Sequence, residues 1–213
     1  MIQIKSFAFS PFAVNTFVLW DETNEAVVID CACSSPTEEA TLTKFIADNK
    51  LTVKRLLNTH LHFDHLLGNS FFYKQYGIKT AAHADDVKHL PLSEQRAFAF
   101  GFNIPVPNYE IDDFLNEGDV IHFGNAELQV LHIPGHSPGS LAYYSPEGQF
   151  IVSGDVIFEH SIGRTDLWCG NLDLLLQGIR EKLFTLPDNT IVYTGHGYAT
   201  TIGDEKLYNP FLK

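Results

Sequence analysis

The first 30 residues contain three segments in which apolar residues alternate with polar ones or run together. Turn-forming residues separate these segments at Ser10-Pro11 and again at residues 21–24, which read Asp-Glu-Thr-Asn. Apolar runs of strand length between short polar turns are typical of sequential antiparallel strands. The pattern therefore predicts an antiparallel meander over residues 1–30.

A helix is predicted next, from Ser35-Pro36 to about Asn49. Proline suits the first turn of a helix because its missing N–H is not needed there. The acidic residues Glu38 and Glu39 suit the positive end of the helix dipole. Residues 53–57, Val-Lys-Arg-Leu-Leu, are then expected to form a strand, which would complete a strand, helix and strand order typical of an α/β fold.

The segment after this strand is predicted to be a ligand-bearing loop, followed by a short helix that starts after His65 and ends at Gly77. Strands are predicted over about residues 116–158, and a further helix should begin after Asn171. Its apolar residues recur at helical spacing and are interpreted as core, with no role in cofactor binding: Leu172, Leu175, Leu176, Ile179 and Leu183. A last strand is predicted at residues 190–193. The whole pattern predicts a layered α/β protein.

The segment from His89 to Phe114 has poor periodicity and is rich in aromatic residues and prolines. Its aromatic residues include Phe98, Phe100, Phe102 and Tyr109. Such a segment is either a hydrophobic wall over a site or a contact between subunits. We favour partial cover of the site, and the oligomeric state is left open.

The strongest chemical signal is Thr-His-Leu-His-Phe-Asp-His at residues 59–65. Alternate residues of an extended segment point to the same side, so His60 and His62 can share one metal ion. The chain must turn after Phe63 to present Asp64 and His65 together to a second ion. The cluster would lie on a loop between a strand and a helix, a usual place for catalytic groups.

Three more ligand-type residues, His136, Asp155 and His196, stand beside glycines at the ends of predicted strands. A glycine next to a ligand lets the backbone come close to a metal ion. Strand ends that meet at one edge would bring all seven residues to a single centre. The seven therefore predict two divalent metal ions per chain, and such centres are typical of hydrolases.

The other histidines are interpreted as packed or solvated residues: His83, His89, His122, His132 and His160. We expect His132 to form a hydrogen bond within the structure that supports the site. Cys31 and Cys33 are interpreted as ordinary buried or half-buried thiols, and Cys169 could lie at the edge of the site.

A chain of 213 residues, 45% of them hydrophobic, can bury one core, so a single domain over residues 1–213 is predicted. The net charge of −12 argues against a nucleic-acid surface. No apolar run has the length of a membrane span, and the N-terminus lacks the regions of a signal peptide. We therefore expect a cytoplasmic protein that acts on a small molecule, with neither nucleic acid nor membrane as partner.

The His-X-His-X-Asp-His motif, with the separated His136, Asp155 and His196, resembles the metallo-β-lactamase superfamily. Segments 153–158, 161–166 and 195–212 are similar to its small, single-domain, glyoxalase II-like (hydroxyacylglutathione hydrolase-like) branch, and the resemblance covers essentially the whole chain. It implies an α/β fold, the αβ/βα four-layer sandwich. It also implies a ligand assignment, in which metal 1 is held by His60, His62 and His136, metal 2 by Asp64, His65 and His196, and both by Asp155.

The resemblance implies a metal-dependent thioesterase that cleaves a hydroxyacyl thioester with a metal-bridging hydroxide. Asp64 and Asp155 would be the catalytic carboxylates. Zn²⁺ is the simplest choice for both ions, and Fe or Mn fits the same ligands. Arg164 is the candidate for binding a substrate carboxylate, although a structural ion pair with Asp166 is an equal alternative.

Class B β-lactamases do not place an aspartate at the position of Asp155. Large glyoxalase II enzymes carry a C-terminal helical domain that holds glutathione, whereas only residues 197–213 follow His196, so we expect low selectivity for glutathione. The alternative function is a mononuclear iron persulfide (sulfur) dioxygenase of the same superfamily, whose iron needs only two histidines and one carboxylate. A structural metal site is disfavoured because it would be closed by four protein ligands.

Overall fold

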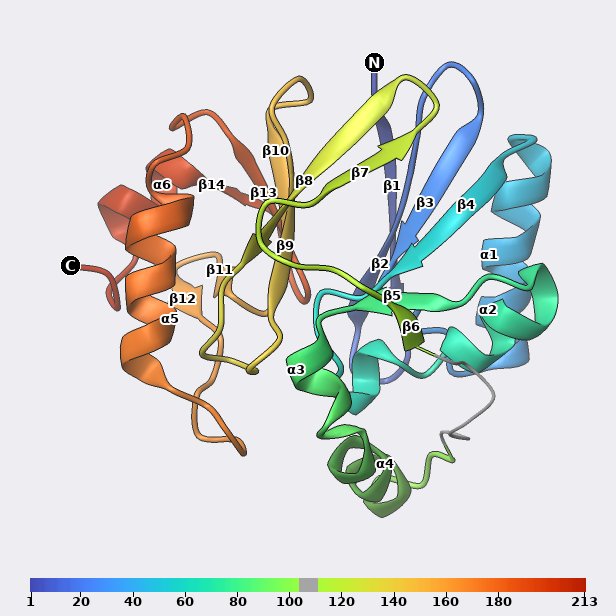
Figure 1. The fold of residues 1–213 in the computed structure, drawn as a ribbon, viewed down its shortest axis with the longest axis horizontal. Coiled ribbons are helices and arrows are strands. Elements are labelled where there is room, and N and C mark those ends of the chain that lie inside the picture. Colours follow the sequence, from blue (N-terminus) through green and yellow to red (C-terminus); the bar gives the residue numbers. More distant parts are fainter. Residues whose placement is uncertain (104–110) are drawn as a thin grey trace.

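Two six-stranded sheets lie face to face in the computed structural model, which describes residues 1–103 and 111–213 (Figure 1). The first sheet has the strand order β1 (Gln3–Phe9), β2 (Val14–Trp20), β3 (Glu25–Ile29), β4 (Thr52–Leu57), β5 (Thr80–Ala82) and β6 (Ile111–Phe114). The second has the order β14 (Thr200–Thr201), β13 (Ile191–Thr194), β10 (Phe150–Gly154), β9 (Leu141–Ser145), β8 (Ala126–His132) and β7 (Val120–Phe123). A small hairpin is formed by β11 (Ile157–Phe158) and β12 (Ser161–Ile162).

Helices cover the outer faces of both sheets (Figure 1). On the first sheet they are α1 (Pro36–Asp48) and α2 (Asn69–Tyr76), and on the second they are α5 (Leu172–Gly178), its π-helical continuation Ile179–Leu183, and α6 (Ile202–Tyr208). Two more helices, α3 (Ala84–Val87) and α4 (Leu90–Ala99), lie beyond the end of the first sheet (Figure 1). The arrangement is the αβ/βα four-layer sandwich that the family resemblance implied.

The N-terminal strands form the predicted meander, because β1, β2 and β3 pair antiparallel in sequence order. Helix α1 begins as predicted, with the Ser35 side chain accepting a hydrogen bond from Glu38 N. The helix returns the chain so that β4 pairs parallel to β3. The carboxyl ends of β3 and β4 therefore meet at the same edge of the first sheet.

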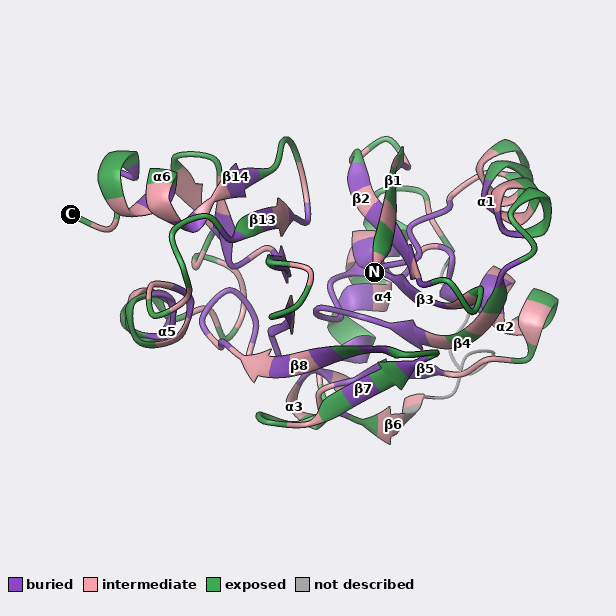
Figure 2. Ribbon diagram, turned by 90° about the horizontal axis from the view of Figure 1, so that it is seen from above, coloured by how far each residue is buried: buried purple, intermediate pink, exposed green. Residues whose placement is uncertain are grey.

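Three layers of apolar side chains hold the sandwich together. The central layer joins both sheets and includes Phe17, Ile29 and Tyr143, which are buried. Leu42 of α1 packs in the layer outside the first sheet, and Leu175 of α5 in the layer outside the second. Figure 2 shows the resulting pattern, with a buried strand β3 and exposed outer turns on α1.

The leucine-rich helix follows Asn171, whose side chain caps it as predicted by accepting from Leu174 N. Leu175, Ile179 and Leu183 are buried core residues. The prediction was wrong for Leu172, which is 47% exposed because it lies in the first turn, on the solvent side.

The segment from His89 to Phe114 contains helix α4, which the sequence analysis missed. The buried positions of this helix are Leu90, Ser93 and Ala97, so its inner face is too small and polar to give an apolar periodicity. The large apolar side chain of Phe98 does not lie on this inner face and is 79% exposed. Residues 104–110, Tyr109 among them, lie outside the described residues.

The helix expected after His65 begins only at Asn69, since Phe63–His65 form a separate 3₁₀ turn. It ends at Gly77, as predicted, in the left-handed conformation that glycine adopts without strain. Across the described ranges, no helix has both the length and the apolar character needed to cross a bilayer.

Candidate metal centre

The seven predicted ligands lie at one edge of the sandwich, where strands of both sheets end. The segment with His60, His62, Asp64 and His65 follows β4, and the loop between β8 and β9 carries His136. Asp155 follows β10 directly, and His196 comes two residues after β13. Because β10 and β13 are parallel, their carboxyl ends deliver both side chains to the same edge.

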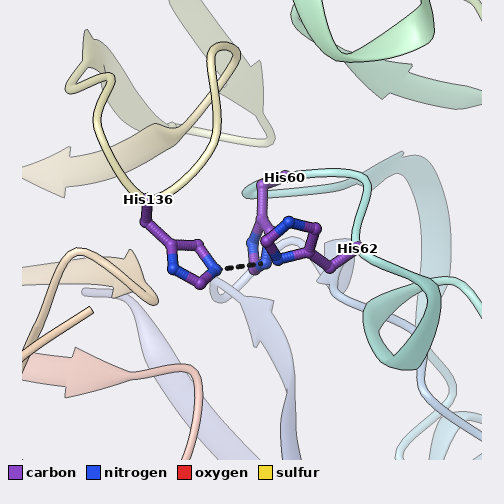
Figure 3. Close-up of side chains that lie close together, drawn as sticks. All are labelled: His60, His62 and His136. Atoms are coloured by element: carbon purple, nitrogen blue, oxygen red, sulfur yellow. Dashed lines mark hydrogen bonds between the residues drawn. The ribbon is translucent and has the colours of Figure 1, made fainter. Parts of the chain in front are cut away.

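His60, His62 and His136 form the first cluster. Their imidazole rings point toward one another from two different loops (Figure 3). One nitrogen of each ring lies within 4.8 Å of the others, and the Nε2 atoms of His60 and His136 are 3.3 Å apart. All three side chains are buried. This cluster can hold one divalent ion.

Asp64, His65 and His196 form the second cluster, with Nε2 of His196 lying 3.4 Å from Oδ2 of Asp64. Asp155 lies between the clusters. Its Oδ2 is 3.6 Å from Nε2 of His136 and 3.6 Å from Nε2 of His196, and its Oδ1 is 3.5 Å from Nε2 of His65. One carboxylate thus faces both clusters.

Hydrogen bonds at Nδ1 set the orientation of several imidazoles. His136 donates from Nδ1 to the carbonyl oxygen of Arg164 at 2.8 Å, and His196 donates to that of Phe12 at 3.0 Å. His65 donates to Oδ2 of Asp30 at 2.9 Å. Because Nδ1 donates to these acceptors, Nε2 is the nitrogen of each ring that is directed to a metal ion.

Thr59 orients His60 in the same way. Its hydroxyl donates to Oδ2 of Asp30 at 2.6 Å, so the hydroxyl oxygen is left to accept from Nδ1 of His60 at 3.1 Å. Asp30 Oδ1 also accepts from the backbone N–H of Thr59 at 2.8 Å. Asp30 therefore supports one imidazole of each cluster.

Unpaired atoms at the centre show that the residues fit a metal ion. Nε2 of His62, Nε2 of His65 and Oδ1 of Asp155 are buried without a hydrogen-bond partner among the described residues. Buried polar atoms without partners are costly, and one bound cation in each cluster would satisfy all three. A Cβ atom on Gly195 would collide with Oδ1 of Asp155, so glycine is needed beside this carboxylate.

The protonation states differ between the rings. Burial, and then the neighbouring imidazoles, hold the pKa of His60 well below its usual value. Burial also opposes the charged form of His65, but Asp30 and Asp155 outweigh it and raise the pKa of His65 to about 10. Without a metal ion, His65 therefore carries a proton that a metal would have to displace.

Sequence reasoning missed two buried carboxylates that support the centre, Asp30 and Asp86. Asp30 ends β3 in a left-handed backbone conformation, with φ of 53°. Asp30 could have been found from the sequence, because it follows a buried apolar strand directly, as Asp155 does.

Asp86 on α3 is 1% exposed and joins two ligand-bearing loops. Its Oδ2 accepts from the backbone N–H of Leu61 at 2.9 Å and from the hydroxyl of Ser137 at 3.0 Å. Its Oδ1 accepts from the N–H of Gly139 at 2.6 Å. No local signal distinguished Asp86 from the adjacent Asp85, which is only half-buried.

A cavity of about 440 Å³ opens above the two clusters. The ligands at its base are His62, Asp64, His136, Asp155 and His196, and its walls are Phe12, Phe63, Ser93, Arg96, Phe100, Arg164 and Leu167. Phe100 stacks on Phe63 with ring centroids 5.4 Å apart. The aromatic segment thus covers part of the site in its described residues, as favoured from the sequence.

Arg164 lines this cavity, but its guanidinium forms a two-bonded ion pair with Asp166, with both N···O distances 2.8 Å. This is the structural alternative that the sequence left open. Its backbone oxygen holds His136, as described above.

The remaining histidines and cysteines lie outside the two clusters. His132 donates from Nε2 to the carbonyl oxygen of Pro138 at 2.8 Å, and so braces the loop that carries His136, as expected. Cys31 and Cys33 are buried free thiols. Cys169 is exposed next to Trp168, whose ring contacts His62, and so it lies at the edge of the site.

Known proteins resemble the chain over nearly its full length. Hydroxyacylglutathione hydrolase GloC of Haemophilus influenzae is 36% identical over 220 residues, which cover 99% of this chain and 98% of that protein. The crystal structure of BLEG-1, described as a B3 metallo-beta-lactamase, matches with a TM-score of 0.90 and 35% identity, and covers 99% and 100% of the two chains. TTHA1623, crystallised in a di-iron-bound form, matches with a TM-score of 0.86 and 33% identity, over 98% and 100%.

The model of the Metallo-beta-lactamase superfamily matches residues 9–196, which include all seven ligand-type residues. Members of this superfamily bind divalent metals, and the two clusters described above supply a candidate site. The chain belongs to the metallo-β-lactamase superfamily, and its general class is that of a metal-dependent hydrolase.

Proposed function

We propose that the protein is a thioesterase that hydrolyses an acyl thioester at a centre of two divalent metal ions. The observation that carries this proposal is the position of the Asp155 carboxylate between two clusters of imidazole and carboxylate ligands. In the proposed assignment, His60, His62 and His136 hold one ion and Asp64, His65 and His196 the other, while Asp155 contacts both.

Two divalent ions would supply a hydroxide at neutral pH and a positive charge for the oxygen of the attacked carbonyl. The side chains of the protein would position the attacking water. Asp64 and Asp155 are the carboxylates among the described cavity residues, so they are the groups that could orient the attacking water and accept its proton. In the protein without metal, the neighbouring imidazoles, His196 foremost, lower the pKa of Asp64 against the effect of burial, so this carboxylate is already ionised when a metal ion binds.

The cavity favours a thioester over an amide. A thiolate leaves without first being protonated, whereas an amine needs a proton from a general acid. The described cavity walls contain no glutamate, lysine or tyrosine that could serve as this acid. The similarity to GloC, a hydroxyacylglutathione hydrolase by name, supports a hydroxyacyl group on the substrate.

Cleavage of a β-lactam is the second candidate, and its support is the similarity to BLEG-1. Zn²⁺ remains our first choice of metal, with Fe and Mn as alternatives, and the di-iron form of TTHA1623 supports iron. A single domain, a cytoplasmic location and a small-molecule substrate remain predictions from the sequence.

The test compares two substrates on the purified protein loaded with Zn²⁺, Fe²⁺ or Mn²⁺. We expect release of free thiol from a lactoyl thioester at a rate well above that of the Asp155→Asn variant, and slow or no opening of a chromogenic cephalosporin. Rapid opening of the cephalosporin without thiol release would favour the second candidate instead.

A further inference from the structure

Ser93 and Arg96 of helix α4, and Phe100 directly after its last residue, line the cavity. Their spacing of three and four residues places them on one side of the helix. The hydroxyl of Ser93 already donates to the carbonyl oxygen of Leu61 at 2.6 Å, and Phe100 packs on Phe63. Arg96 is thus the residue of this side that can still bind a ligand.

The guanidinium of Arg96 has no ion pair or hydrogen bond within residues 1–103 and 111–213. The other arginine of the cavity, Arg164, is engaged by Asp166. Arg96 is half-buried, and a partly desolvated guanidinium gains most from an anion that satisfies its forked donors.

The surroundings of Arg96 select for a small anion. Phe12, Phe63 and Leu167 line the cavity with apolar surface, which strengthens a charge interaction in their vicinity. The cavity walls hold only one unpaired cation among the described residues, and a single guanidinium matches the single charge and planar shape of a carboxylate.

We propose that Arg96 is a specificity-determining residue that binds a carboxylate of the substrate, so that carboxylate-bearing thioesters are the preferred class. This assignment rests on the proposed function and narrows the class of thioester that the protein hydrolyses. The carboxylate can belong to the thiol part or to the acyl part of the substrate, because the same guanidinium would bind either.

The kinetic test uses Arg96→Met, which keeps an unbranched stem and removes the charge. Arg180→Met is the matched control, because Arg180 is exposed, lies outside the cavity and has no ion pair in the described part of the chain. Three substrates are compared: lactoyl-N-acetylcysteamine, which is neutral, lactoylglutathione, with carboxylates in the thiol part, and succinyl-N-acetylcysteamine, with one in the acyl part.

Arg96→Met should lower kcat/KM at least about tenfold for one or both carboxylated substrates, mainly through KM, and less than about twofold for the neutral one. Arg96→Lys should recover part of the loss, and Arg180→Met should change nothing. The responding substrate identifies the part that carries the carboxylate. Equal losses on all three substrates, or no loss on either carboxylated one, would overturn the assignment.

A binding measurement separates this assignment from the proposed function. Calorimetric titration of the metal-loaded protein with S-methylglutathione and with succinate should give a Kd at least about tenfold higher in Arg96→Met for one of them, and an unchanged Kd in Arg180→Met. If no thioester is cleaved but this difference is found, the proposed function fails and the carboxylate site stands. An unchanged Kd for both ligands would overturn the site.

Discussion

Asp30 accepts a hydrogen bond from His65 through Oδ2, at 2.9 Å from Nδ1, and both side chains are buried. The same oxygen accepts from the hydroxyl of Thr59 at 2.6 Å, which in turn orients His60. A single carboxylate outside the ligand set thus connects the two clusters. Such supporting carboxylates fix ring orientation and raise the basicity of the ligand.

Asp30→Asn should weaken binding of the second metal ion by about 10–100-fold, more than binding of the first. An asparagine has one acceptor oxygen, so it cannot satisfy the donors that now reach both oxygens of Asp30. Metal titration against a competing chelator measures the effect. Asp48→Asn on the surface of α1 is the control, and equal affinities in the two variants would show that Asp30 does not support the centre.

Asp86→Ala should lower the free energy of unfolding by about 3 kcal/mol or more, because it leaves three donors unpaired in the interior. Asp85→Ala is a matched control at the adjacent position. Asp85 is bound to Lys88 at the surface, so its removal should cost less than about 1 kcal/mol. Urea denaturation of both variants gives the comparison, and similar losses would contradict the role of Asp86.

The chain should bind about two divalent ions, and Asp155→Asn should lower this number and reduce turnover at least about a hundredfold. The physical reason is that Asp155 faces both clusters, so the loss of its charge affects both ions. Elemental analysis of protein purified without chelators gives the stoichiometry. Full activity with one tightly bound iron would exclude the two-metal account.

Metal binding at pH 8 should release at least one proton per chain from His65. The pKa of His65 is raised to about 10 without metal, so the ring is protonated at pH 8, and the metal must displace this proton. Apparent affinity should therefore increase as pH rises toward 10. Calorimetric titrations in two buffers of different ionisation enthalpy count the protons, and Asp30→Asn should release fewer. Identical counts in the two proteins would contradict this origin of the proton.

Much of the fold was predictable because its signals are local. The meander, the cap at Ser35, the end of α2 at Gly77 and the cap at Asn171 each depend on residues adjacent in sequence. Helix α4 was missed because its buried side consists of a leucine, a serine and an alanine, which give no apolar stripe.

The candidate site was likewise predictable only in part. The positions of all seven ligand-type residues at one edge followed from motif spacing and strand ends. Asp86 and Arg96 could not be found from sequence, because their significance depends on which loops α3 and α4 meet in space. Arg164 stood out in sequence, yet its ion pair with Asp166 occupies the guanidinium.

The central claim is that the centre hydrolyses thioesters, and the most direct test is to measure thiol release with and without oxygen. Metal-loaded protein should release free thiol from a lactoyl thioester at the same rate in air and under strict anaerobiosis, because hydrolysis consumes only water. Oxygen uptake and sulfite formation from a glutathione persulfide, with no thiol released from any thioester, would contradict the account and establish a persulfide dioxygenase.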